Sequence, residues 1–194
     1  MTAPGQPTPT PEPAPPEPER FRSYLRLLAR MQSDGRGPWA MEASDVVQMT
    51  LLKAHQARDQ FRGATAGEMA AWLRAILART LADAARAASR AKRDAGPLLS
   101  LEAAVEDSAL RLAEVLPADQ PTPSRVVERA ERAAALAEAI EQLPDDQREA
   151  VILKHLRGMT VDEVCAATGK SPAAVAGLLR RGLRRLRELL AEAP

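Results

Sequence analysis

Arginine side chains are the residues in this sequence whose type and spacing point most directly to a chemical role. Five follow one another closely near the C-terminus, at Arg180, Arg181, Arg184, Arg185 and Arg187. Only Glu188 opposes them in that stretch. Guanidinium groups along one helix are typical of proteins that bind the phosphates of a nucleic acid. A merely solvated basic helix is the alternative interpretation, because short patterns of this kind also arise by chance.

No catalytic or metal-binding pattern accompanies these arginines. His55 and His155 lack paired Cys or carboxylate neighbours at ligand spacing, so we expect no metal site and no cofactor. No Ser/His/Asp grouping and no glycine-rich phosphate loop is found, so we expect no catalytic residues and no enzyme. Cys165 is the single cysteine and excludes an internal disulfide, which fits a reducing cytoplasm. We expect it to pack between two helices rather than to sense redox state.

The elements that must position the arginines are predicted to be helices. Ala, Leu, Arg and Glu are abundant and aromatic residues make up 3% of the 194 residues, which favours an all-α fold. The net charge of +1 does not indicate whether the protein binds nucleic acid. Only the distribution of charge along the chain can indicate that. No apolar run is long enough to span a bilayer and no signal peptide opens the sequence, so we expect a cytoplasmic protein without membrane insertion.

The C-terminal arginines lie on the last of three predicted helices, and the last two of these form a helix-turn-helix. The first helix is expected to begin at Pro144 and to end at Gly158. The second is expected to begin with a capping box of Thr160 and Glu163. Its predicted inner face consists of Val161, Val164 and Ala167. The remaining signals are the turn residue Gly169, the N-cap Ser171, the first-turn Pro172 and the small or β-branched packing residues Cys165 and Val175.

Three further amphipathic helices are predicted in the N-terminal half, over residues 20–32, 45–61 and 68–92. Ser44 is expected to cap the second. The third helix and the residue after it carry another group of cations, and between positions 74 and 93 only Asp83 opposes them: Arg74, Arg79, Arg86, Arg90, Lys92 and Arg93. Two basic helices on a nearly neutral chain suggest two contacts along one polyanion.

Proline-rich and acidic segments divide the chain. Residues 1–19 are expected to form a disordered tail, more plausibly a solvated one than a ligand for a proline-recognition domain. Residues 20–93 and 124–194 are the predicted domains, and residues 94–123 are the linker. From position 100 to 146 the sequence has eleven acidic residues and only four basic ones. This connector either mimics nucleic acid or simply solvates the linker, and a short, weakly stable helix is expected over residues 100–116.

Two segments carry a resemblance to a known family. LPDDQREAVILKHLRGMTVDEVCAATGKSPAAVAGLLRRGLRRLREL resembles region four of the sigma-70 family of transcription initiation factors. ASDVVQMTLLKAHQARDQFRG, followed by WLRAILARTLADAAR, resembles region two. No region three separates them, and this layout is similar to that of the extracytoplasmic-function (ECF) group. The resemblance implies a three- to four-helix region 2-like domain and a region 4-like helix-turn-helix domain, joined by a flexible acidic linker.

The resemblance also implies a function and its partners. Such a factor binds core RNA polymerase, directs it to minus-ten and minus-thirty-five promoter elements and aids melting; an anti-sigma factor is a candidate further partner. The polymerase-binding residues implied by the DVVQ motif are Asp45, Gln48, Leu51 and Leu52. The implied DNA-binding residues are Arg79, Thr80, Arg86, Arg90, Ser171, Ala173, Ala174, Arg180, Arg181 and Arg184.

The sequence departs from the family pattern at both DNA-contacting helices. Arg79 stands where the family commonly has Asn, seven positions after Trp72. Trp72 is more plausibly a core residue than a platform for an unpaired base. The predicted recognition helix carries small residues where the family often has polar or basic ones: Ala173, Ala174, Ala176 and Gly177. We therefore expect relaxed reading of the upstream element, with the arginines binding phosphate.

Two other functions stay open on the sequence alone. A helix-turn-helix regulator could bind an operator as a dimer without docking on polymerase, although the DVVQ helix and the basic helix after it argue against this. A helical adaptor that no longer reads DNA is conceivable because of the alanine-rich recognition helix.

Overall fold

The computed structural model of the chain describes residues 16–32, 42–90, 103–108, 111 and 123–192, and every regular element among them is helical. This confirms the predicted all-α class. Residues 1–15 of the proline-rich tail and most of the linker lie outside the described residues. The predicted disorder up to residue 19 is wrong at its end, because Pro18 is buried and begins a 3-10 turn with Glu19. Within the described part of the chain, no helix is long and apolar enough to cross a membrane.

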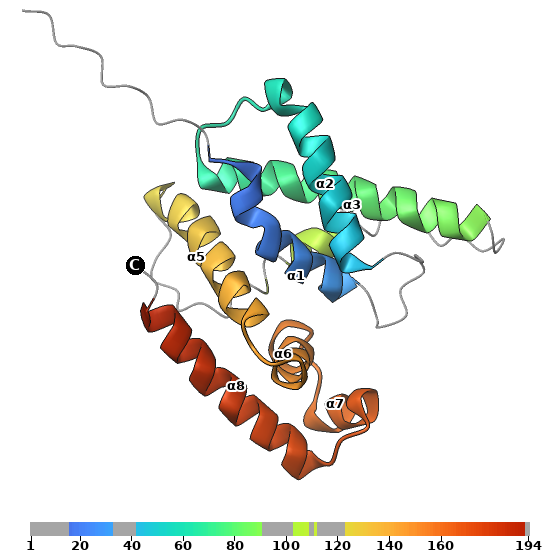
Figure 1. Cartoon of the computed structure of the whole chain (residues 1–194), viewed down its shortest axis with the longest axis vertical. Coiled ribbons are helices and arrows are strands. Elements are labelled where there is room, and N and C mark those ends of the chain that lie inside the picture. Colours follow the sequence, from blue (N-terminus) through green and yellow to red (C-terminus); the bar gives the residue numbers. More distant parts are fainter. Residues whose placement is uncertain (1–15, 33–41, 91–102, 109–110, 112–122, 193–194) are drawn as a thin grey trace, which may run out of the picture.

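The described part of the N-terminal half contains three α-helices. A 3-10 turn, η1 (Pro18–Phe21), leads into α1 (Arg22–Gln32), which is followed by α2 (Ala43–Gln56). After a second 3-10 turn, η2 (Arg58–Gln60), the chain enters the long helix α3 (Ala66–Arg90), which packs across α2 (Figure 1). The predicted helix over residues 45–61 therefore ends five residues early, at Gln56.

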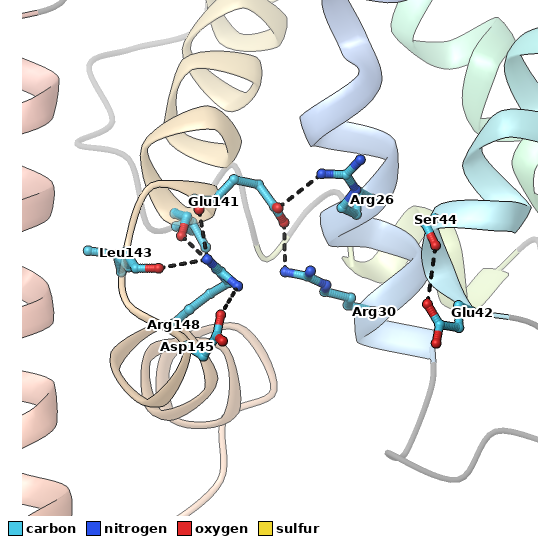
Figure 2. Close-up of polar contacts among 9 residues, drawn as sticks. Arg26, Arg30, Glu42, Ser44, Glu141, Leu143, Asp145 and Arg148 are labelled. Atoms are coloured by element: carbon cyan, nitrogen blue, oxygen red, sulfur yellow. Dashed lines mark hydrogen bonds and ion pairs between the residues drawn. The ribbon is translucent and has the colours of Figure 1, made fainter.

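The beginning of α2 corrects the expectation that Ser44 caps it. The N-cap residue is Glu42, whose backbone is extended, and no side chain provides the cap hydrogen bond. The Ser44 hydroxyl instead donates to the Glu42 carboxylate at 3.5 Å (Figure 2). Because the helix begins two residues earlier than predicted, Ser44 lies inside the first turn, where it cannot act as the N-cap.

The C-terminal half begins with α5 (Pro123–Glu141), followed by α6 (Asp145–Val151). A π-helical turn, η3 (Ile152–Leu156), continues α6, and α7 (Val161–Thr168) and α8 (Pro172–Glu192) complete the fold. Pro144 is the N-cap of α6 rather than its first helical residue. Between α3 and α5, residues 103–108 are helical, which agrees with the short helix predicted there.

Helix α5 joins the two halves of the molecule. It contacts α1 and α3 on one side and α8 on the other (Figure 1). One buried apolar cluster runs through these contacts and includes residues of both halves, among them Leu28, Leu77, Leu136 and Ile140. A second, smaller cluster lies inside the helix-turn-helix and consists of Leu153, Val164 and Val175.

Close packing of α8 against α6 depends on a glycine. A Cβ atom at Gly182 would stand 3.0 Å from the Val151 Cγ2 atom and 3.5 Å from the Gln147 Cβ atom. Val151 is 2% exposed, so its side chain has little room to move. Gly177, on the same helix, differs because a Cβ atom there would meet only the guanidinium group of Arg181.

The two glycines give a matched pair of substitutions. Gly177→Ala should increase the free energy of unfolding by about 1 kcal/mol, because alanine favours the helix. Gly182→Ala gains the same preference but overpacks the α6–α8 contact, which costs about 1–3 kcal/mol. Urea denaturation followed by circular dichroism should therefore rank Gly182→Ala below Gly177→Ala. Equal stability of the two variants would show that the α6–α8 contact accommodates the added methyl group without loss of free energy.

Candidate nucleic-acid interface

The helix-turn-helix is built from local backbone signals, most of them as predicted. Gly158 adopts φ 71° after η3, and Gly169 adopts φ 68° at the end of α7, which confirms both turn assignments. Thr160 and Glu163 form the predicted capping box, with the Thr160 amide donating to the Glu163 carboxylate at 2.7 Å. These backbone and hydroxyl hydrogen bonds lower the pKa of Glu163, so the carboxylate is ionised at neutral pH.

The packing inside this motif follows the prediction with one exception. Val164 and Val175 are fully buried between α7 and α8, and Cys165 packs half-buried beside them. Ala167, which was expected on the inner face of α7, is exposed. Helix α7 has only eight residues, and its inner face closes on the cluster through Val164 one turn before Ala167.

The first turn of α8 presents almost no hydrogen-bonding side chain. Ser171 accepts a hydrogen bond from the Ala174 amide at 3.3 Å and so acts as the predicted cap. Ala173, Ala174 and Ala176 are exposed beside it, while Val175 faces the core. In helix-turn-helix proteins the N-terminal residues of the recognition helix reach base edges. Here that turn offers methyl groups, which can contact the thymine methyl but cannot hydrogen-bond a base.

Beyond the alanine-rich turn, α8 is strongly basic. Arg180, Arg181 and Arg184 are all exposed, as are Arg185 and Arg187. Glu188 shares its carboxylate between Arg185, at 3.2 Å, and Arg184, at 4.0 Å. Exposed pairs of this kind contribute little to stability, so the guanidinium groups stay available to another anion.

Helix α3 carries fewer available cations than the sequence suggested. Arg79 is exposed, and Arg86 is held at 2.6 Å by Asp83, which also accepts from Lys53 of α2 at 3.0 Å. The hydrogen bond from Lys53 lowers the pKa of Asp83, so this carboxylate is ionised. Arg74 pairs with Glu106 of the linker at 2.8 Å. The side chain of Arg90 lies outside the described residues.

Thr80 and Trp72 face the interior of the molecule. Thr80 is 1% exposed, and its hydroxyl donates to the Ile76 carbonyl oxygen at 2.9 Å. It therefore cannot reach a base unless α3 repacks. Trp72 is half-buried and lies against Phe61, with 5.2 Å between the ring centroids, which agrees with its predicted packing role.

Helix α2 has an exposed face that combines polar and apolar side chains. Asp45 and Gln48 are exposed, and Leu52 is 57% exposed. Leu51 instead lies in the core at 2% exposure. Sequence reasoning missed Met49, which is 40% exposed. Its spacing of three residues from Leu52 and four from Asp45 places it on their side of the helix and could have indicated it.

Among the described residues, no group of three or more His, Cys, Asp or Glu side chains could hold a metal ion. His55 and His155 lie 100 positions apart in the sequence. Partial burial lowers the pKa of His155, and the charge of Lys154 lowers it further. A lowered pKa keeps the imidazole neutral near pH 7.

Comparison with known protein families gives two matches along the chain. The model of Sigma-70 region 2 matches residues 19–91, and the model of Sigma-70, region 4 matches residues 133–186. The first match covers α1 to α3, and the second runs from α5 to α8.

Three curated relatives resemble the chain over most of its length. CarQ, an RNA polymerase sigma factor of Myxococcus xanthus, is 32% identical over 165 residues, which cover 85% of this chain and 81% of CarQ. The RNA polymerase sigma-H factor of Pseudomonas aeruginosa is 29% identical, with 79% and 74% covered. The ECF RNA polymerase sigma factor SigE of Mycolicibacterium smegmatis is 26% identical over 78% of this chain, but the chain spans only 52% of SigE.

Among solved structures, the sigma factor RpoE of Bartonella quintana, crystallised with the anti-sigma factor NepR, aligns with 90% of this chain at 24% identity. The alignment covers 94% of RpoE with a TM-score of 0.35.

The basic part of α8 leads to a prediction about its interaction with duplex DNA. Arg181→Ala and Arg184→Ala should weaken binding almost equally on all sequences, because each removed phosphate contact takes about 0.9 from the logarithmic salt slope. Ala174 substitutions should instead change sequence preference more than affinity. Fluorescence-anisotropy titrations at several salt concentrations, on matched and scrambled duplexes, measure both effects.

The control for this experiment is Arg62→Ala, an exposed arginine outside α3 and α8, which should leave the salt slope unchanged. A sequence-selective loss from the α8 variants with an unchanged salt slope would mean that these arginines read bases.

Proposed function

The chain belongs to the sigma-70 family of RNA polymerase sigma factors, and on that premise we propose that it is an ECF-type transcription initiation factor. It binds core RNA polymerase, directs it to promoters through two DNA elements and aids melting of the downstream one. The chain itself performs no bond chemistry in this role. Its place of action is the cytoplasm, with the polymerase.

The observation that carries the proposal is the pairing of two family regions on one chain, each with an exposed basic helix. Region 2 contributes α3 with Arg79 and Arg86, and region 4 contributes α8, with four of its five arginines inside the matched residues. An operator-binding regulator needs only the helix-turn-helix and leaves the region 2 match without a role. The combination therefore favours an initiation factor over the regulator and over the adaptor.

For the polymerase contact we propose the exposed face of α2, made of Asp45, Gln48, Met49 and Leu52. Exposed apolar side chains beside polar ones are typical of protein interfaces, where the apolar members are desolvated and the polar ones set orientation. The two large hydrophobic residues that the described surface leaves most open are Met49 and Leu52, one turn apart on this helix. Leu51 is not part of this face, because it packs in the core and helps to hold α2 in place.

For DNA we propose a division of labour between the two ends of α8. The alanine-rich first turn meets the base edges with little specificity, and Arg180, Arg181 and Arg184 bind phosphates. On α3, Arg79 is the exposed candidate for the downstream element, with Arg86 as a second cation once it leaves Asp83. Thr80 belongs to this proposed surface only if α3 repacks on binding.

The function is tested by run-off transcription with purified core polymerase and genomic fragments. Initiation at defined sites only when the chain is added supports the proposal. Operator binding without any transcript, together with failure to bind core polymerase, would favour the regulator instead.

The α2 contact gives a sharper prediction. Asp45→Ala combined with Gln48→Ala should raise the dissociation constant for core polymerase about tenfold, which corresponds to about 1.4 kcal/mol of lost interface energy. Leu52→Ala should have a similar effect without loss of helicity, because the side chain is 57% exposed. Affinity is measured by fluorescence titration of labelled chain with core enzyme.

The chain provides a matched control for the double variant. Asp59 and Gln60 are also exposed, lie in η2 just after α2, and offer the same two side-chain types. Asp59→Ala with Gln60→Ala should bind core polymerase like the wild type. If both double variants bind equally well, α2 is not the docking face.

A further inference from the structure

On one side of α8, a glycine leaves a gap between two exposed residues. Residues spaced four apart lie on the same side of a helix, so Ala173, Gly177 and Arg181 follow one another along α8. A Cβ atom at Gly177 would lie 3.2 Å from the Nη1 atom of Arg181, 3.7 Å from its Nη2 atom and 3.8 Å from its Cζ atom. The atoms nearest to this gap therefore all belong to one guanidinium group, which lies over the backbone of Gly177.

The direction of the Arg181 side chain brings its charge closer to the start of α8 (Figure 1). Long side chains on a helix lean toward its N-terminus. Here the guanidinium group reaches the level of a residue four positions earlier, which is about 6 Å along the axis at about 1.5 Å per residue. The charge of Arg181 thus lies next to the alanine-rich first turn, and in a helix-turn-helix protein that turn meets the base edges.

No carboxylate of the described residues holds this guanidinium group. Glu188 pairs with Arg184 and Arg185, at 4.0 Å and 3.2 Å, and no ion pair within the described part of the chain includes Arg181. A guanidinium group presents its N–H donors as a rigid fork, which fits two oxygen atoms of a phosphate at once. The Arg181 side chain is therefore available to an anion from outside the chain.

A side chain at position 177 would displace the guanidinium group. Nonbonded heavy atoms attract each other best at about 3.5–4.0 Å, so a Cβ atom at 3.2 Å requires the Arg181 side chain to move. That side chain is exposed and flexible, so it can move without disturbing the packing of the helices. The effect of an added methyl group therefore falls on the position of the charge.

We propose that Gly177 is a positioning residue for DNA binding. Its missing side chain lets the Arg181 guanidinium group lie back along α8 and bind the phosphate beside the base pairs that the alanine-rich turn meets. Small side chains let the helix backbone approach the groove closely, and the same lack of bulk gives the guanidinium group its place. This inference rests on the proposed function, because it deepens the role that α8 has there.

The test compares Gly177→Ala with the wild-type full chain by fluorescence-anisotropy titration on duplex DNA at several salt concentrations. One phosphate contact contributes about 0.9 to the logarithmic salt slope, which corresponds to about eightfold in affinity at about 0.1 M salt relative to about 1 M. Gly177→Ala should weaken binding about three- to eightfold at about 0.1 M salt and reduce the slope by up to about 0.9. Matched and scrambled duplexes should show the same loss, because a phosphate contact carries no sequence information.

A cycle of double variants shows whether the effect passes through Arg181. In an Arg181→Ala background, Gly177→Ala should change neither the affinity nor the salt slope any further. In an Arg180→Ala background it should keep its full effect, because none of the atoms nearest to the gap belongs to Arg180. Arg180 is a matched control, since it is the same residue type at the neighbouring exposed position.

Stability is measured on the same variants, because a loss of folding would also weaken DNA binding. Gly177→Ala should have a higher urea midpoint than the wild type, since alanine favours the helix interior over glycine. A variant that is more stable and yet binds DNA more weakly does not owe its loss to unfolding.

The outcomes separate this inference from the proposed function. Equal DNA binding of Gly177→Ala and the wild type overturns the positioning role. An undiminished loss in the Arg181→Ala background also overturns it, and would show that Gly177 itself meets the DNA. If the cycle behaves as expected but core polymerase with the wild-type chain yields no run-off transcript, the inference stands and the proposed function fails. Defined initiation together with unchanged binding by Gly177→Ala means the reverse.

Discussion

The structure depends on how one arginine ends helix α5. The Arg148 guanidinium donates to three carbonyl oxygens in the last turn of α5 and just beyond it: Ile140 at 3.2 Å, Glu141 at 2.8 Å and Leu143 at 2.6 Å. Asp145, the first residue of α6, holds the same guanidinium at 2.7 Å (Figure 2). A helix end leaves its final carbonyl groups without intrahelical partners, and a buried carbonyl without one costs about 1–3 kcal/mol. One cation thus satisfies the end of α5 and fixes where α6 begins.

The position of the proposed recognition helix follows from that turn. The contacts of Arg148 fix the direction of α6 relative to α5. Helix α8 packs against α6 at Gly182, where the two helices come close. Val164 and Val175 then lock α7 on α8. The same turn places Glu141 against α1 (Figure 2). The geometry of the DNA-binding motif and the closure of the two halves therefore share one origin, and a change at the α5–α6 turn affects both.

The features that could be predicted from the sequence are those whose partners lie within a few residues. The Thr160–Glu163 capping box, the two left-handed glycines and the Ser171 cap all involve neighbours along the chain, so residue type and spacing suffice to find them. The implied polymerase-binding set on α2 combines residues from two faces of that helix. On α2 the period of 3.6 residues places Leu51 with Val47 and Ala54 in the core, whereas Met49 and Leu52 point outward.

Contacts between distant segments could not be found in the same way. Arg157 stands beside Gly158 at the predicted end of a helix, and nothing in the sequence indicates that it bonds the Met31 carbonyl oxygen, 126 positions away in the chain. Arg74 was counted with the DNA-facing cations, yet Glu106 holds it 32 positions away. Spacing along one helix predicts which side chains share a face, but it does not reveal which acid from another element neutralises a given cation. Tertiary packing decides that question.

Charge pairing of this kind also bears on how a chain with a net charge of +1 binds a polyanion. In this structure, acidic side chains occupy several of the guanidinium groups: Glu141 holds Arg26 and Arg30, Asp83 holds Arg86, and Glu106 holds Arg74. A phosphate that binds one of these guanidinium groups competes with the carboxylate that holds it. Higher salt weakens both kinds of contact, so these intramolecular ion pairs and the binding of phosphates weaken together.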